Sequence, residues 1–135
     1  MISKIFVNLA VEDLDKSVAF FEAVGFSFNP QFTDETAACM VMSEDIYAML
    51  LTHAKFAAFT NKPIVDARNA TEVLTAVSVE SKAQVNELVD KAIAAGGKEE
   101  REPMDYGFMF GRSFEDPDGH IWEVIWMNPA HVQKG

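Results

Sequence analysis

Apolar and polar residues alternate along most of the chain, and this alternation is interrupted twice by helical spacing. Residues 5–11 alternate with a period of two, which is typical of a half-buried strand. Asp13 then provides an N-cap, and apolar residues recur at helical spacing as far as Gly25, so a helix is predicted over residues 14–24. Three more strands are predicted over residues 26–32, 37–42 and 46–52, the first of them broken by Pro30.

The same order of elements returns in the second half. Residues 73–79 alternate, Ser81 and Gln84 form a capping box, and a helical stripe ends at Gly96. Strands are predicted over residues 98–104, 107–114 and 121–127. Superposing Val11 on Val79 gives an offset of 68 residues (79 − 11), about half of the 135. The pattern predicts one α+β domain of two β-α-β-β-β repeats, residues 1–52 and 71–127, with a connector at 53–70 and a frayed tail at 128–135.

A turn with a clear local code joins the last two strands. In Asp116-Pro117-Asp118-Gly119, proline presets one φ angle and glycine tolerates a positive one. Glu123 follows in mid-strand, between two tryptophans. A carboxylate inside a sheet is costly unless it is paired, exposed to water or used. We therefore regard Glu123 as the first candidate for function.

Composition narrows the possible partners. A net charge of −10 argues against nucleic acid and against anionic membrane surfaces. No apolar run approaches the roughly 20 residues of a membrane span. The single Cys39 cannot form an internal disulfide and is expected to be a small buried residue, and without secretory features a reducing cytoplasm is the expected compartment.

These patterns together resemble a known family. The duplicated unit, the stretch Val11-Glu12-Asp13-Leu14 and the turn at 116–119 with Glu123 resemble the vicinal-oxygen-chelate superfamily, which includes glyoxalase I, extradiol dioxygenases and the fosfomycin and bleomycin resistance proteins. The chain looks most like the branch called "predicted lactoylglutathione lyase". The resemblance implies the glyoxalase/bleomycin resistance fold, in which curved sheets enclose a cup, and it favours a homodimer.

The resemblance also indicates where metal ligands would lie. Carried over by position, they fall on Phe6, Leu74, Glu123 and a site near Met49, or Leu51 if the alignment slips. By the resemblance, histidines would stand at the positions that Phe6 and Leu74 occupy here. Only Glu123 therefore suits a metal, even if Asn8 adds one oxygen. A divalent ion needs three or four nitrogen, oxygen or sulfur donors. We therefore expect no cofactor, and regard a divalent metal as disfavoured.

The side chains that line the cup follow from the same resemblance. The expected ligand-binding set is Phe6, Asn8, Met49, Leu74, Ser113 and Glu123. Either Arg112 or Ser113 lies opposite Glu123, and the resemblance favours Ser113. That register places Phe108, Phe110 and Phe114 in the core. Glu123 itself is expected to act as a general base, or else to be paired with Asn8, Ser113 or Arg112.

Two functions follow. The first is a protein that binds a small, partly apolar molecule in the cup without metal. The alternative is a divergent metal-dependent lyase or isomerase of the glyoxalase type that uses Glu123 as ligand or base. Four other side chains are weaker candidates: His120 is expected to bond locally and His131 to face solvent, whereas His53 and Tyr106 are possible site residues.

Overall fold

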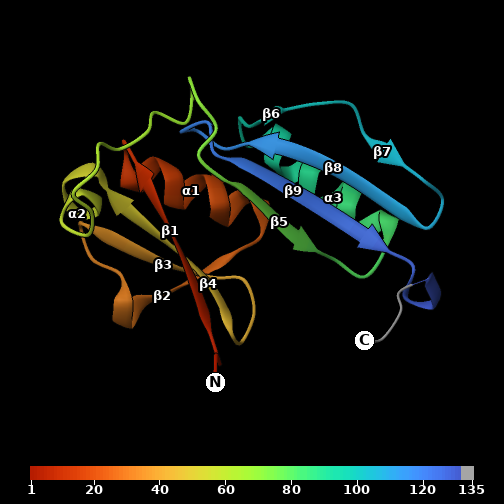
Figure 1. Ribbon diagram of the computed structural model, residues 1–135, viewed down its shortest axis with the longest axis horizontal. Helices are drawn as coiled ribbons and strands as arrows, with labels where there is room; N and C mark the ends of the chain where they lie inside the picture. Colours follow the sequence, from red (N-terminus) through yellow and green to blue (C-terminus); the bar gives the residue numbers. More distant parts are fainter. Residues whose placement is uncertain (132–135) are drawn as a thin grey trace. The chain divides into compact units, whose positions relative to one another are not determined.

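The computed structural model describes residues 1–131, which fold as two compact units. Unit 1 is Met1–Asp66, and unit 2 begins at Ala67. Each unit contains one twisted sheet and one long helix (Figure 1). In the described part of the chain, no helix has the length and apolar character needed to cross a membrane.

Unit 1 has a four-stranded sheet in the order β1-β4-β3-β2. The edge strand β1 runs parallel to β4, and the other neighbours are antiparallel. Its elements are β1 (Ile5–Val11), α1 (Leu14–Val24), β2 (Ser27–Asn29), the 3-10 helix η1 (Pro30–Phe32), β3 (Ala37–Val41), β4 (Ile46–Thr52) and α2 (His53–Ala57).

Unit 2 repeats this plan. Its sheet has the order β5-β9-β8-β6, with β7 also paired to β8, and β5 runs parallel to β9. The elements are β5 (Leu74–Ser78), α3 (Lys82–Ala94), β6 (Lys98–Glu99), β7 (Met104–Asp105), β8 (Met109–Glu115), β9 (Ile121–Met127) and the 3-10 helix η2 (Pro129–His131). The order of elements predicted from the sequence is therefore confirmed in both halves.

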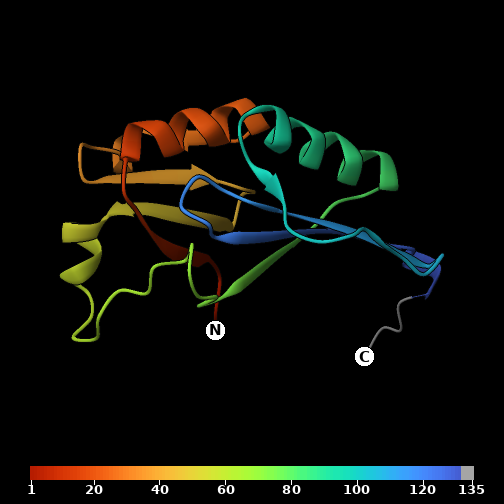
Figure 2. The same cartoon turned by 90° about the horizontal axis from the view of Figure 1, so that it is seen from above.

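Local capping fixes where both long helices begin. The Asp13 carboxylate accepts a hydrogen bond from the Lys16 backbone N–H at 3.1 Å. At α3, the Ser81 hydroxyl accepts from the Gln84 N–H at 3.1 Å, while the Gln84 side chain accepts from the Glu80 N–H at 2.7 Å. In Figure 2, α1 and α3 each cover one face of the sheet of their own unit. We call the opposite face of each sheet its inner face.

Three segments differ from the prediction. The strand over residues 26–32 ends at Asn29, because Pro30 starts a 3-10 turn whose first N–H, from Gln31, is capped by the Asn29 side chain at 3.0 Å. The strand over residues 98–104 is two short strands separated by residues 100–103, where Pro103 cannot donate a ladder bond. The connector at 53–70 begins with α2, capped by Thr52.

The core of each unit lies between its helix and the outer face of its sheet. Phe21 is fully buried and packs edge-to-face against Phe20, and Phe114 stacks on Trp122 with ring centroids 6.4 Å apart. The prediction that Phe108 belongs to this core is wrong, because it precedes β8 and is 37% exposed. The helix-facing side chains are taken up by this packing, and exposed side chains of the strands such as Phe6 and Leu74 lie on the inner faces.

Candidate functional site

The register between β8 and β9 decides which side chains reach the inner face of unit 2. Ser113 lies directly opposite Glu123, and Ala76 of β5 lies opposite Glu123 on the other side. Arg112 lies opposite Val124 and so points toward α3. The predicted register with Ser113 facing Glu123 is therefore confirmed.

Arg112 is a structural arginine on the helix side of this sheet. Its guanidinium donates two hydrogen bonds to the Glu99 carboxylate, at 2.9 and 3.0 Å, and two more at 2.9 Å to Asn86 and Asp90 of α3. These carboxylates hold the pKa of Arg112 above its usual value, Glu99 having the largest effect. Arg112 does not face the inner surface and cannot hold a ligand there.

Glu123 has a partner that the sequence did not suggest. Arg101, in the segment between β6 and β7, donates from Nη2 to Glu123 Oε1 at 3.0 Å. The expected partners were Asn8, Ser113 or Arg112, and Arg101 takes their place because the strand expected over 98–104 breaks there. Glu123 is 21% exposed and Arg101 43% exposed, so the pair is accessible to a ligand.

Ser113 is the buried polar group of this face. It is 0% exposed, and its Oγ forms no hydrogen bond in the described part of the chain. An unsatisfied buried hydroxyl costs about 1–3 kcal/mol relative to a satisfied one. A buried hydroxyl without a partner is uncommon, and this one lies next to Glu123 across the strand pair.

Hydrogen bonds within the turn at residues 116–120 hold β8 and β9 in this register. The buried Asp116 carboxylate accepts bonds from the N–H groups of Asp118 and His120, both at 3.0 Å, and from Trp122 Nε1 at 3.1 Å. Burial is the main cause that raises the pKa of Asp116 to about 6. The loop closes with Asp116 N–H donating to His120 O at 3.0 Å, and this closure sets the register of Ser113.

The inner face of unit 1 is more apolar. Asn8, Met49 and Cys39 lie side by side in one row across β1, β4 and β3. In the next row toward the N-terminal end of β1, Phe6 stacks on Tyr47 with ring centroids 4.9 Å apart. Asn8 donates from Nδ2 to Phe6 O at 3.3 Å. Cys39 is 2% exposed, as expected, and burial raises the pKa of its thiol.

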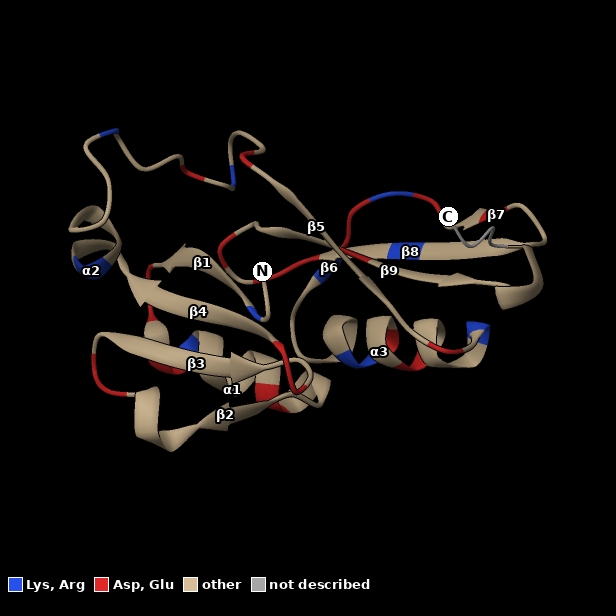
Figure 3. Ribbon diagram, turned by 60° about the horizontal axis from the view of Figure 1, so that its bottom comes forward, with Lys and Arg blue, Asp and Glu red and all other residues tan. Residues whose placement is uncertain are grey.

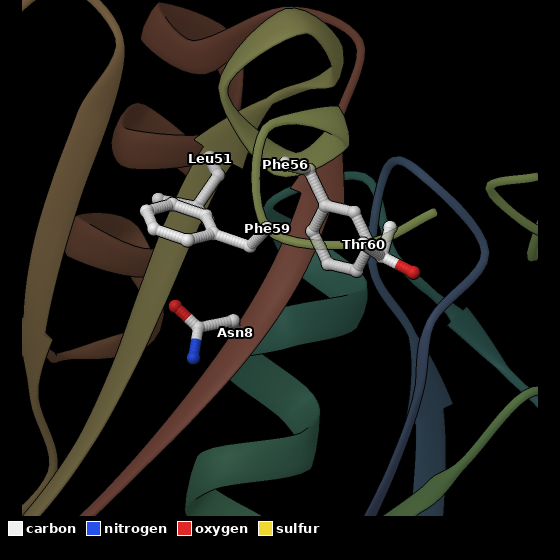
Figure 4. Close-up of a pocket in the computed structure, with 5 residues that line it drawn as sticks. All are labelled: Asn8, Leu51, Phe56, Phe59 and Thr60. Atoms are coloured by element: carbon white, nitrogen blue, oxygen red, sulfur yellow. The ribbon is translucent and has the colours of Figure 1, made fainter. Parts of the chain in front are cut away.

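A pocket of about 360 Å³ opens on this face, beside α2. Figure 4 shows its five lining side chains, which are Asn8, Leu51, Phe56, Phe59 and Thr60. The sequence identified Asn8 and, as a second choice, Leu51, whereas Phe56, Phe59 and Thr60 were missed within the connector. The available signal was Thr52, an N-cap that accepts from the Lys55 N–H at 3.3 Å and starts the helix that carries Phe56.

The residues at the expected metal positions do not fit a divalent ion. In unit 1 these positions carry the phenyl ring of Phe6 and the thioether of Met49, and in unit 2 they carry the alkyl chain of Leu74 and the carboxylate of Glu123. Glu123 is already bonded to a guanidinium. Among residues 1–131, no three His, Cys, Asp or Glu side chains are grouped so that they could hold a metal. No chemical step through a metal follows from this donor set.

The remaining candidates are not at one place. His120 is buried, and its backbone bonds locally to Asp116 as expected, whereas its side chain does not, because Nδ1 lies 3.1 Å from Oε1 of Glu72, which is distant in the sequence. His131 is exposed and stacks on Phe108 at 4.1 Å. His53 is exposed at the start of α2. Tyr106 is 60% exposed, and its hydroxyl lies 3.8 Å from Met104 Sδ, the sulfur that Arg101 also contacts.

Comparisons with solved structures agree with this fold. A hypothetical protein from S. aureus is similar, with 29% identity, a TM-score of 0.77 and coverage of 93% of this chain and 95% of that one. A fosfomycin resistance protein from Mesorhizobium loti has 15% identity and a TM-score of 0.68, with 96% and 97% covered. A bleomycin resistance determinant encoded on transposon Tn5 has 20% identity and a TM-score of 0.65, with 92% and 97% covered.

None of the curated proteins compared matches the chain. The model of one protein family does match, over residues 5–124, which span both β-α-β-β-β repeats and end just beyond Glu123. The resemblance first suggested by the repeats and the turn at 116–119 is thereby confirmed. The chain belongs to the Glyoxalase/Bleomycin resistance protein/Dioxygenase superfamily.

Proposed function

We propose that the protein binds a small, partly apolar molecule on the inner face of unit 1, and that it does so without a metal ion. The observation that carries this proposal is the pocket of about 360 Å³ beside α2. That volume falls within the range of roughly 300–1,000 Å³ found for small-molecule sites. The chemistry of the walls defines the class of ligand.

The walls are apolar with two hydrogen-bonding groups. Leu51 is 3% exposed, and Figure 4 shows the ring of Phe59 next to it and the ring of Phe56 next to Thr60. Asn8 and Thr60 supply an amide and a hydroxyl. Lys55 Nζ lies 5.7 Å from the Phe59 ring centroid, which places a positive charge near the rim. These features favour a flat apolar molecule that carries one or two hydrogen-bonding or anionic groups.

A fluorescence titration with 8-anilinonaphthalene-1-sulfonate tests the pocket. Phe59→Ala removes a ring that is 71% exposed, so the fold should be unaffected while probe affinity falls about tenfold. Phe32→Ala is the matched control, because Phe32 is 58% exposed in the same unit but does not line the pocket. Equal loss of affinity in both variants would contradict the proposal.

The retained carboxylate of Glu123 supports the second candidate, a divergent metal-dependent lyase or isomerase. Its ion pair with Arg101 counts against this reading, because the guanidinium already compensates the charge. Elemental analysis followed by calorimetric titration with zinc, nickel and manganese separates the two candidates. We expect no tight uptake. Stoichiometric tight binding would instead favour the lyase, and Glu123→Gln would then abolish turnover.

We also propose that the protein is a cytoplasmic homodimer, as family members often are. Apolar side chains exposed at the start of β1 and β4 support an interface, since Ile5 is 52% and Ile46 43% exposed. Light scattering on a gel-filtration column should give twice the mass of the chain. A single-chain mass at every concentration would refute this part of the proposal.

A further inference from the structure

Two arginines of unit 2 are paired with carboxylates in very different ways. Arg112 is 11% exposed and saturated, with a two-pronged contact to Glu99 and further bonds to Asn86 and Asp90. Arg101 makes one contact to Glu123 and a weak one to Met104 Sδ at 3.4 Å, within the described residues. A guanidinium can donate five hydrogen bonds, so Arg101 keeps several donors available.

Glu123 is equally incomplete. Arg101 Nη2 contacts Oε1, and no described residue forms a hydrogen bond to the second oxygen. Across β9, Ala76 offers only a methyl group and is exposed, so space lies open on one side of the carboxylate. On the other side is the buried Ser113 hydroxyl, which also lacks a partner among residues 1–131. Glu123 and Ser113 therefore lie side by side in one row, Arg101 reaches Glu123 from the segment between β6 and β7, and all three keep unused hydrogen-bonding capacity.

We propose that Arg101, Glu123 and Ser113 form a binding site for a small zwitterion, with the charge pattern of an α-amino acid. The carboxylate of the ligand binds Arg101 and its ammonium binds Glu123. The single bond between the two side chains is then replaced by two ion pairs. The Ser113 hydroxyl, next to Glu123 across the strand pair, supplies the remaining hydrogen bond to the headgroup.

The signs of the neighbouring charges favour a zwitterion over a simple ion. An anion bound at Arg101 would be repelled by the Glu123 carboxylate. Arg101 also lies between Glu100 and Glu102 in the sequence, and Figure 3 shows these acidic positions in red between β6 and β7. A cation at Glu123 would lie against Arg101. Only a neutral ligand that carries both charges satisfies both members without repulsion.

The rest of the inner face favours an apolar side chain on that ligand. The rows next to Glu123 contain Leu74 with Ile121 on one side and Ser78 with Ile125 on the other. Leu74 is 56% exposed, so its alkyl chain is available for contact. This site lies in unit 2, whereas the pocket proposed above lies in unit 1.

Calorimetry on the full chain with three probes that share the branched alkyl chain of leucine tests the charge pattern. L-leucine carries both charges, 4-methylpentanoate only the carboxylate, and 3-methylbutylamine only the ammonium. L-leucine should bind, and each singly charged analogue should bind about tenfold more weakly or worse. Binding of 4-methylpentanoate as tight as that of L-leucine, or no binding of L-leucine at all, would overturn the proposal.

Variants test the location. Arg101→Gln and Glu123→Gln should each weaken L-leucine about tenfold or more. Lys91→Gln is the control, because it removes only an exposed ion pair with Glu87 on α3 and should leave L-leucine binding unchanged. Unaltered affinity in the Arg101 and Glu123 variants would place the site elsewhere and refute the assignment.

Ser113→Ala gives a signature that a purely structural serine would not produce. Removing a buried hydroxyl without a partner should leave the melting temperature of the free protein equal or higher. The same variant should bind L-leucine about fivefold more weakly, because the completing hydrogen bond is lost. A lower melting temperature together with unchanged affinity would refute the role of Ser113.

Discussion

Gly119 should be the glycine that tolerates substitution least. Its φ is +86°, in the region that disfavours side chains. A Cβ built there would lie 2.8 Å from both the N and Cα of Arg68, well inside van der Waals contact. The clash is with backbone, so it cannot be relieved by rotating a side chain. Gly119→Ala must push the segment at 67–68 away from the turn.

The magnitude follows from two separable costs. Placing alanine in a left-handed conformation costs about 1–2 kcal/mol. Overpacking a close backbone contact adds about 1–3 kcal/mol. Movement of Arg68 would also weaken its bond to Pro117 O, now 3.3 Å, and its ion pair with Asp118, now 3.6 Å. We expect Gly119→Ala to lower the free energy of unfolding by about 2–5 kcal/mol.

Two other glycines provide matched controls. Gly107 has a φ of +80°, close to that of Gly119, but no atom lies within 4 Å of the Cβ position. Gly107→Ala should therefore cost only the conformational part, about 1–2 kcal/mol. Gly111 has an ordinary strand conformation, and its nearest contacts would be 3.7 and 3.9 Å, so Gly111→Ala should be close to neutral.

Urea denaturation followed by tryptophan fluorescence measures all three variants, since Trp122 is buried beside the turn. The difference between Gly119→Ala and Gly107→Ala isolates the backbone contact. Equal losses in these two variants would refute the reasoning, because the segment at 67–68 would then not lie against the turn.

Three further predictions concern unit 2. Arg112→Lys should lower the free energy of unfolding by about 1–2 kcal/mol in urea melts, because an ammonium cannot keep the two-pronged contact to Glu99; no loss would show that the network is dispensable. The pKa of Asp116, raised by burial from 3.8 to about 6, means that the folded state binds the proton more tightly, so this residue should stabilise the protein by about 1 kcal/mol more at pH 5 than at pH 7. In Asp116→Asn, the difference in the free energy of unfolding between pH 5 and pH 7 should disappear in urea melts. An unchanged difference would assign it to another group. Asp116→Ala should cost about 3 kcal/mol or more by calorimetric melting, because three donors lose their acceptor; a loss below that of Arg112→Lys would contradict this accounting.

Much of the fold could be predicted because its signals are local. The period of two in residues 5–11, the capping box at Ser81 and the turn at 116–119 each specify an element without help from distant contacts. The register that brings Ser113 opposite Glu123 was predicted from the family resemblance, because the turn by itself left Arg112 as the alternative; in the structure the Asp116–His120 backbone bond closes the loop. Where the local code was mixed, as over residues 98–104, the predicted strand was wrong.

The site residues that were missed are those set by irregular backbone. Arg101 reaches Glu123 from a break between two short strands, and no periodic pattern describes where such a side chain points. Phe59 lies beyond the end of α2, in a segment without sustained spacing, so its place at the pocket depends on tertiary structure. Binding residues often lie on loops, and these are the segments that periodic sequence patterns describe least well.

The inner faces of the two units show where the repeats have diverged. In unit 1 the row across the sheet pairs Asn8 with Met49, and in unit 2 the corresponding row pairs Ala76 with Glu123. The polar group has thus moved from the first strand of the unit to the last. On the helix side, the corresponding Leu50 and Val124 are both 0% exposed and apolar. Core packing constrains those positions, whereas Asn8 and Glu123 on the inner rows keep exposed surface, so the two repeats share one core and differ in the polar group that each inner face presents.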